Sequence, residues 1–297
     1  MPAKGNGFVD TWERPPVVCW RPLFWISLTD KRILWLLKMI LNQDSDECIN
    51  ISALSKTYVV NGSTELILSD INLSVLERGF VSVVGPSGCG KSTLLNIIAG
   101  LDEPDSGSIY IKGIEGPRLG KIGYMQQKDL LLPWRTVLDN ASLGLETQGL
   151  SKKDARDRVL SEIETFGLSG YEQMYPYSLS GGMRQRVAFL RTMVMDQSIV
   201  LLDEPFGALD SLTRVQMQLW LLEIWDLMKK TIILVTHDVD EALFLSDTIC
   251  LLSARPGTSA FTISVDLQRP REHHMLSQPE FVSMKQDVLS SLWEYVV

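Results

Sequence analysis

The segment GPSGCGKS, residues 85–92, limits the fold of this chain more than any other feature. It follows the apolar run FVSVV and precedes STLLNIIAG, which has the pattern of a helix. Glycines at this spacing let a loop turn its backbone N–H groups toward phosphate oxygens without clashes from Cβ atoms. The pattern therefore predicts a phosphate-binding loop (P-loop) between a strand and a helix. The residues expected to bind the phosphates are Gly85, Pro86, Ser87, Gly88, Cys89, Gly90, Lys91, Ser92 and Thr93.

Three continuous apolar runs predict the sheet that carries this loop. They span Phe80–Gly85, Ser198–Asp203 and Thr231–His237, and such runs are typical of parallel strands buried on both faces. Helical patterns lie between them, notably at Ser151–Phe166 and Leu212–Met228. The alternation of strands and helices predicts an α/β fold that binds its ligand at the carboxyl ends of the strands.

Reactive side chains occur in the P-loop and at the ends of the other two strands. Lys91 is placed to reach the β- and γ-phosphates of a nucleotide, and the Ser92 hydroxyl to ligate Mg²⁺. Asp203 is expected to hold the same ion through its water shell. Glu204 is suited to polarise an attacking water, and His237 to contact the γ-phosphate or that water. The alternatives are a solvated strand end for the acidic pair and a satisfied core residue for the histidine.

A second glycine-rich turn, LSGGMRQR, leads into the helical run RVAFLRTMV. Ser180, Gly181 and Gly182 expose backbone N–H groups at the start of that helix, a position suited to an anion. The motifs together resemble the ATP-binding subunits of ABC transporters over roughly residues 49–256, and LSGGMRQR is similar to the signature of that family. The resemblance implies an ATPase that binds ATP and Mg²⁺. It also implies a P-loop NTPase (RecA-like) core with an antiparallel β subdomain and a helical signature subdomain at about 128–177.

The resemblance assigns further roles to single residues. Tyr58 in SKTYVV matches the aromatic that stacks on adenine, and Gln127 in GYMQQKD matches the glutamine that senses Mg²⁺ and water. Gln126 departs from the apolar or aromatic residue of the family, which leaves that assignment open by one position. GALD at 207–210 matches the D-loop, and His237 matches the switch histidine. In the family two ATPase domains pair head to tail, which implies that Ser180, Gly181 and Gly182 face ATP held by a second copy or a paralogue.

Finer features resemble importers. LLLPWRTVLDN and LSARPG are similar to nitrate, sulfonate and taurine importer ATPases, and GMRQRVAFLRT to the branch for pyrimidines and thiamine precursors. The resemblance implies permease subunits, a substrate-binding protein and a position on the cytoplasmic face of the inner membrane. Trp134 is expected either to contact the permease or to lie in the core. An exporter subunit and a soluble ABC ATPase remain alternatives. The net charge of −8 argues against a nucleic-acid partner.

The two ends of the chain extend past this pattern. Residues 1–47 form a tryptophan-rich extension with six basic and three acidic side chains up to Leu41, a composition suited to an anionic membrane face. A misassigned start codon and a disordered leader are the alternatives. No apolar run is long enough to predict a membrane-spanning helix; the nearest, Val17–Leu41, is interrupted by charges.

The tail at 257–297 is expected to form a strand and a helix that pack on the domain or on a neighbour. Ser277 and Glu280 have capping-box spacing, with Pro279 in the first turn. The apolar residues that follow at helical spacing are Phe281, Met284, Val288, Leu292 and Val296.

Overall fold

The computed structural model describes residues 47–60, 62–254 and 256–296. The expected extension at 1–47 therefore lies outside the described residues except for Glu47, as does the segment Val17–Leu41. Within the described ranges, no helix is both long and apolar enough to cross a membrane.

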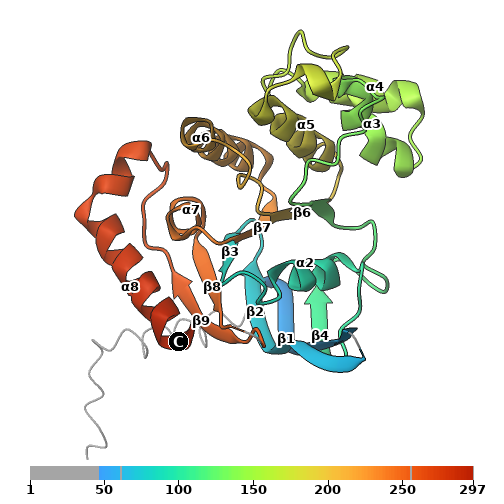
Figure 1. The fold of residues 1–297 in the computed structure, drawn as a ribbon. Coiled ribbons are helices and arrows are strands. Elements are labelled where there is room, and N and C mark those ends of the chain that lie inside the picture. The colour runs from blue at the N-terminus through green and yellow to red at the C-terminus, as the bar shows by residue number, and fades with distance from the viewer. Residues whose placement is uncertain (1–46, 61, 255, 297) are drawn as a thin grey trace, which may run out of the picture. The chain divides into compact units, whose positions relative to one another are not determined.

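A six-stranded sheet carries the P-loop (Figure 1). Its first five strands are parallel, and the last pairs antiparallel with its neighbour. In spatial order they are β5 (Gly123–Met125), β6 (Ile199–Asp203), β7 (Thr231–Thr236), β3 (Phe80–Val84), β8 (Thr248–Leu252) and β9 (Ser259–Ser264). Every residue of β3, β6 and β7 is buried, which confirms the predicted parallel sheet.

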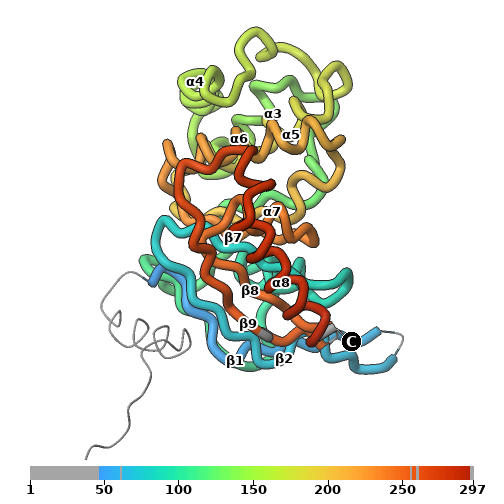
Figure 2. Tube along the Cα trace, turned by 90° about the vertical axis from the view of Figure 1, so that its left-hand side faces the viewer, coloured from blue at the N-terminus to red at the C-terminus, as the bar shows by residue number. Residues whose placement is uncertain are grey.

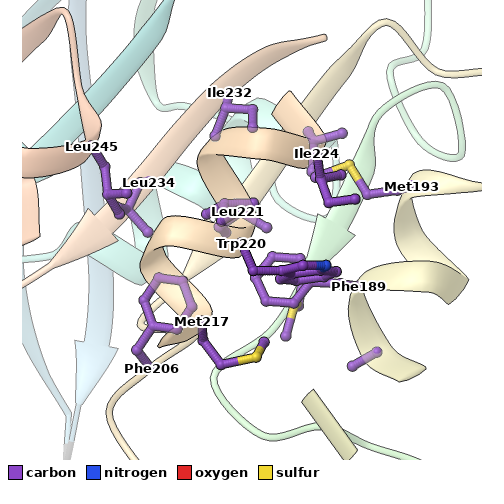
Figure 3. Packing of buried hydrophobic residues seen from close by; sticks show 14 of the residues in the cluster. Phe189, Met193, Phe206, Met217, Trp220, Leu221, Ile224, Ile232, Leu234 and Leu245 are labelled. Carbon is purple, nitrogen blue, oxygen red and sulfur yellow. The ribbon is translucent and has the colours of Figure 1, made fainter. Parts of the chain in front are cut away.

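Alternate residues of these strands enter two separate hydrophobic clusters, because successive side chains of a strand point to opposite faces. In β7, Ile233 and Val235 belong to one cluster, while Ile232 and Leu234 belong to the other. Figure 3 shows the second cluster, where Trp220 meets Phe189 and other apolar side chains.

The first cluster lies between the two sheets of the molecule. A three-stranded antiparallel sheet is ordered β2 (Ser63–Leu76), β1 (Glu47–Val60) and β4 (Ser106–Ile111). Helix α2 (Lys91–Ala99) buries Leu94, Leu95, Ile97 and Ile98 in the same cluster as residues of both sheets. The P-loop helix is therefore fixed between the two sheets.

The opposite face of the parallel sheet carries most of the remaining helices. α3 (Val137–Thr147), α4 (Lys152–Glu162) and α5 (Gly181–Met193) form a group at the far end from the antiparallel sheet (Figures 1 and 2). A 3-10 turn, η1 (Pro176–Ser178), precedes α5. α4 ends earlier than the predicted Ser151–Phe166, since the chain turns from Ile163 to a left-handed Gly167.

The C-terminal half adds α6 (Ser211–Met228), α7 (Val239–Leu245), η2 (His273–Ser277) and α8 (Pro279–Val296). Phe281 and Val288 of α8 are fully buried in the second cluster, and Figure 2 shows the path of the helix. The predicted Ser277 cap is wrong by one residue. The first helical hydrogen bond runs from Val282 N to the carbonyl of Gln278 at 3.1 Å, while the Ser277 hydroxyl donates to the carbonyl of His274.

Candidate functional site

An open cleft of about 700 Å³ lies at the carboxyl ends of β3, β6 and β7. This volume is within the usual range for small-ligand sites. Ten of its lining residues are ones that the sequence predicted, and they include the first three residues of α2. The lining residues are Tyr58, Val60, Glu65, Ile67, Ser87, Gly88, Gly90, Lys91, Ser92, Thr93, Gln127, Glu204 and His237.

The P-loop wraps around the buried amine of Lys91. Lys91 Nζ donates to the carbonyl oxygens of Gly85 at 2.8 Å and Pro86 at 3.0 Å. Gly90 has a φ of 104°, and a Cβ there would lie 2.6 Å from Cδ2 of Leu68, so this turn requires glycine. Among the predicted loop residues, the structure places Gly85, Pro86 and the buried Cys89 outside the lining of the cleft.

Asp203 ends β6 and is buried beside Ser92. Burial raises the pKa of the Asp203 carboxyl, and the neighbouring Glu204 adds to that rise. The Ser92 hydroxyl and the Lys91 ammonium oppose it by stabilising the ionised form. The acid therefore sits where a cation would be strongly favoured, because a positive charge offsets the cost of burying a carboxylate.

Glu204 contacts two other predicted residues of the cleft, Gln127 and His237. Its carboxylate accepts a hydrogen bond from Gln127 Nε2 at 3.1 Å, and its other oxygen lies 3.2 Å from Nδ1 of His237. Its backbone has a φ of 45°, a left-handed conformation that is costly for a glutamate, and its N–H donates to the carbonyl of Val235 at 2.9 Å. That bond ties the turn after β6 to β7, at whose end His237 follows.

The structure places the adjacent glutamines Gln126 and Gln127 differently. Gln127 contacts Glu204 and lines both the cleft and an adjoining hollow, whereas Gln126 lines only the hollow, with Tyr124 and Asp203. Gln127 is thus the glutamine that lies beside Glu204 in the cleft.

Tyr58, on β1, also lines the cleft. Its ring is half-buried, and its hydroxyl donates to the carboxylate of Asp102. Lys56 Nζ lies 5.2 Å from the ring centroid. The hydrogen bond fixes the ring at the cleft wall, in a position where a flat aromatic ligand can stack on it.

The glycine-rich turn at 180–182 does not line this cleft. Ser180 is exposed, and its Oγ accepts from the backbone N–H of Met183 as the N-cap of α5. Gly182 is buried against Thr213, whose Cγ2 would lie 2.9 Å from a Cβ at this glycine. The chain therefore presents its phosphate cleft and its second anion-binding turn as two separate features.

A small cavity of about 20 Å³ behind the cleft was not anticipated from the sequence. Glu204 and His237 line it together with Arg214, Asp238 and Glu241. Glu241 is 5% exposed, and its Oε2 accepts from Gln218 Nε2 at 3.3 Å. A carboxyl group buried next to a catalytic centre is hard to predict, because in the sequence it reads as an ordinary residue of the helical run VDEALFL.

The donor set at the cleft fits Mg²⁺. The Ser92 hydroxyl, the Asp203 carboxylate and the Gln127 amide supply oxygen ligands on adjoining surfaces. No group of three or more His, Cys, Asp or Glu side chains that could hold a metal occurs within the described residues. Mg²⁺ binds through one or two carboxylates together with substrate phosphates, and Asp203 supplies one such carboxylate.

Comparison with known proteins places the chain among transport ATPases. Residues 68–207 match the family described as ABC transporter. An uncharacterized ABC transporter ATP-binding protein of Methanocaldococcus jannaschii is 45% identical over 84% of this chain and 92% of its own. The formylaminopyrimidine import ATP-binding protein of Halalkalibacterium halodurans is 43% identical over 78% and 92%. The aliphatic sulfonates import ATP-binding protein of Bacillus thuringiensis is 45% identical over 75% and 88%.

A solved structure supports the same grouping. The chain resembles a bacterial ABC transporter cassette described as a dimer, with a TM-score of 0.65 and 33% sequence identity. The alignment covers 74% of this chain and all of the cassette.

Proposed function

We propose that this chain, which belongs to the ATP-binding proteins of ABC transporters, is the ATPase subunit of an importer for a small solute. One observation carries the proposal. The P-loop, the Asp203–Glu204 pair, Gln127 and His237 come from four separate segments and line one cleft and the hollow that adjoins it.

ATP hydrolysis in this cleft needs a water aligned with the γ-phosphate. Glu204 is the group that orients and polarises that water, because its carboxylate lies between Gln127 and His237. Lys91 and the N–H groups of the loop stabilise the charge of the phosphates. His237 holds the departing phosphate in line from the side of β7, and Tyr58 stacks on the base.

Mg²⁺, held by Ser92 and Asp203 with Gln127 beside them, would neutralise charge on the phosphates when it is bound. The buried carboxyl of Asp203, whose charged form is disfavoured by its surroundings, is suited to that site.

The second anion-binding turn completes the site from another copy. Ser180 lies outside the chain's own cleft, so in a head-to-tail pair it faces the nucleotide of the partner. A helix N-terminus contributes up to about 2 kcal/mol to the binding of an anion. Hydrolysis is thereby coupled to the approach of a second ATPase chain.

An exposed aromatic surface is suited to contact the permease. Trp134 is 71% exposed, so the alternative of a core tryptophan is wrong. Tyr177 is 76% exposed and stacks on Tyr175, with ring centroids 5.6 Å apart. A hydrogen bond from Val137 N to the carbonyl of Met174 at 2.8 Å brings the two segments together. Clusters of exposed aromatic side chains are typical of protein interfaces.

The cargo is chosen elsewhere in the transporter. Relatives of nearly equal similarity are named for aliphatic sulfonates and for formylaminopyrimidine, so the ATPase chain does not follow the chemistry of the solute. A permease and a substrate-binding protein would select it, with this chain at the cytoplasmic face of the membrane. The import names of both relatives favour an importer over an exporter or a soluble ABC ATPase.

Affinity capture from gently solubilised membranes tests this proposal. The tagged wild-type chain is expected to recover a multi-spanning permease, identified by mass spectrometry. Trp134→Glu is expected to lose that permease while it binds ATP as well as the wild type does. Leu227→Glu, at an exposed site on α6, is the matched control and is expected to retain the permease. Recovery of soluble partners alone by the wild-type chain would contradict the proposal.

A further inference from the structure

A small apolar groove adjoins the nucleotide cleft. It has a volume of about 230 Å³ and lies between the P-loop and the last turns of α8. Pro86 forms one wall, and Leu289, Leu292 and Trp293 form the other. His237 lines both this groove and the nucleotide cleft, so the two open on the same side of the molecule. The groove is thus continuous with the face that carries the P-loop.

The far wall of the groove exposes a large apolar side chain. Trp293 is 68% exposed, although the same helix buries Phe281 and Val288 completely. Leu289 and Leu292 are partly buried against the core, so they are held in place while Trp293 projects beyond them. Tryptophan is prominent among the residues that contribute most to protein interfaces. This end of α8 is therefore shaped as a contact surface.

A second exposed apolar side chain lies beside the glycine-rich turn at 180–182, which we call the signature turn. Leu212, in the first turn of α6, is 77% exposed. Its neighbour Thr213 packs against Gly182 of the glycine-rich turn, since Thr213 Cγ2 would lie 2.9 Å from a Cβ placed at this glycine. Leu212 is therefore exposed one residue from the contact between α6 and the glycine-rich turn that contains Ser180.

We infer that Leu212 of one copy docks in the apolar groove between the P-loop and α8 of a second copy. The inference rests on the head-to-tail pairing proposed above, because in that pairing the signature face of each copy meets the P-loop face of the other. The groove is lined by apolar residues and His237, with no carboxylate or ammonium group, which suits a leucine.

The contact gives α8 a role in the nucleotide-driven cycle. The groove and Leu212 bury each other only when the two faces approach, so the contact stabilises the paired state and not the separated one. Because His237 lines both hollows, packing in the groove also restricts the histidine that contacts Glu204. The C-terminal helix is thus part of the interface between copies.

Cysteine cross-linking in the full chain tests the docking directly. The background carries Glu204→Gln to slow hydrolysis and Cys19→Ser; Cys48, Cys89 and Cys250 are buried. A Leu212→Cys chain is mixed with a Trp293→Cys chain and treated with a short bis-maleimide, with or without ATP and Mg²⁺. The expected result is a covalent dimer in the mixture that depends on ATP. Leu227→Cys replaces Leu212→Cys as the matched control and is expected to give none.

Sedimentation of the same samples distinguishes a failure of the docking from a failure of the head-to-tail pair. An ATP-dependent dimer without the cross-link would overturn the docking and leave the paired site standing. Absence of any ATP-dependent dimer would overturn the head-to-tail pair, and the docking with it. Efficient cross-linking of the Trp293→Cys chain alone would show that α8 contacts α8, which contradicts Leu212 as the occupant.

A second measurement removes the contact instead of trapping it. In the Glu204→Gln background, Trp293→Ala is expected to raise the dissociation constant of the ATP-dependent dimer about tenfold, the usual scale for an interface tryptophan. Leu227→Ala is expected to leave that constant unchanged. Equal constants for the Trp293 and Leu227 variants would overturn the inference.

Discussion

At the residue scale, the backbone of Glu204 is the least ordinary feature of the molecule. A left-handed glutamate costs on the order of 1–3 kcal/mol, and the surrounding bonds must hold it there. The N–H bond to Val235 and the side-chain contacts with Gln127 and His237 do so. The carboxylate held in this way lines the cleft, where we propose that it orients the attacking water.

Replacing Glu204 tests that role. Glu204→Gln is expected to reduce the rate of ATP hydrolysis on the order of a hundredfold or more, because general-base assistance contributes ~10²–10⁴. ATP binding is expected to remain, since the P-loop is untouched. Steady-state phosphate release and equilibrium nucleotide binding measure the two quantities. Near-normal turnover in the variant would contradict the role of this carboxylate.

The buried carboxyl group of Glu241, behind the site, has a raised pKa. Burial raises the pKa of Glu241 to about 7, and the neighbouring Asp238 adds to the rise. Hydrogen bonds from Thr236 and Gln218 and the charge of Arg214 oppose it. The carboxyl is therefore still largely protonated in the folded chain at pH values where an exposed glutamate is ionised.

The sign of its effect on stability follows from linkage. The unfolded chain loses this proton near the ordinary value of 4.5, and the folded chain near 7. The free energy of unfolding therefore falls as the pH rises through this window. Urea unfolding at about pH 5 and pH 8 is expected to show a smaller loss for Glu241→Gln than for the wild type, by on the order of 2–3 kcal/mol. Equal losses in both proteins would contradict a buried, protonated Glu241.

At the element scale, the sequence predicted those strands and helices that depend on the local pattern of apolar residues. The strands at β3, β6 and β7 are continuous apolar runs, and the parallel arrangement brings their carboxyl ends to one edge. That rule sufficed to place Lys91, Glu204 and His237 in one cleft. The elements whose ends depend on tertiary contacts were harder. α4 stops at Glu162, and the cap of α8 lies one residue past Ser277.

The packing of the signature helix against α6 gives a test at this scale. Phe189 of α5 is fully buried, and its ring centroid lies 5.4 Å from that of Trp220 and 6.0 Å from that of Phe206. Phe189→Ala is expected to lower the free energy of unfolding by about 3–5 kcal/mol, through lost burial and the cavity left behind. Leu160→Ala, at an exposed site on α4, is expected to change it by less than about 0.5 kcal/mol. Similar values for the two variants would contradict this packing.

At the scale of the whole molecule, the sequence predicted less because the relevant neighbours are far apart in the chain. Nothing near residue 293 indicates that α8 ends beside the P-loop, and the contact becomes visible only once the helix has packed. The cavity lined by Arg214 and Glu241 was not predicted for the same reason, because it forms only once these segments have packed together. The separation of Ser180 from the cleft, by contrast, agrees with the expectation that a second copy completes the site.

Mixing two inactive variants tests whether a second copy completes the site. Lys91→Ala removes the phosphate contact of one chain, and Ser180→Arg blocks the turn that faces the nucleotide of the other. In a mixed pair, the intact P-loop of the Ser180→Arg chain meets the intact turn of the Lys91→Ala chain. ATP hydrolysis is therefore expected to appear on mixing, although each variant alone is inactive. A mixture as inactive as its components would contradict a site shared between two copies.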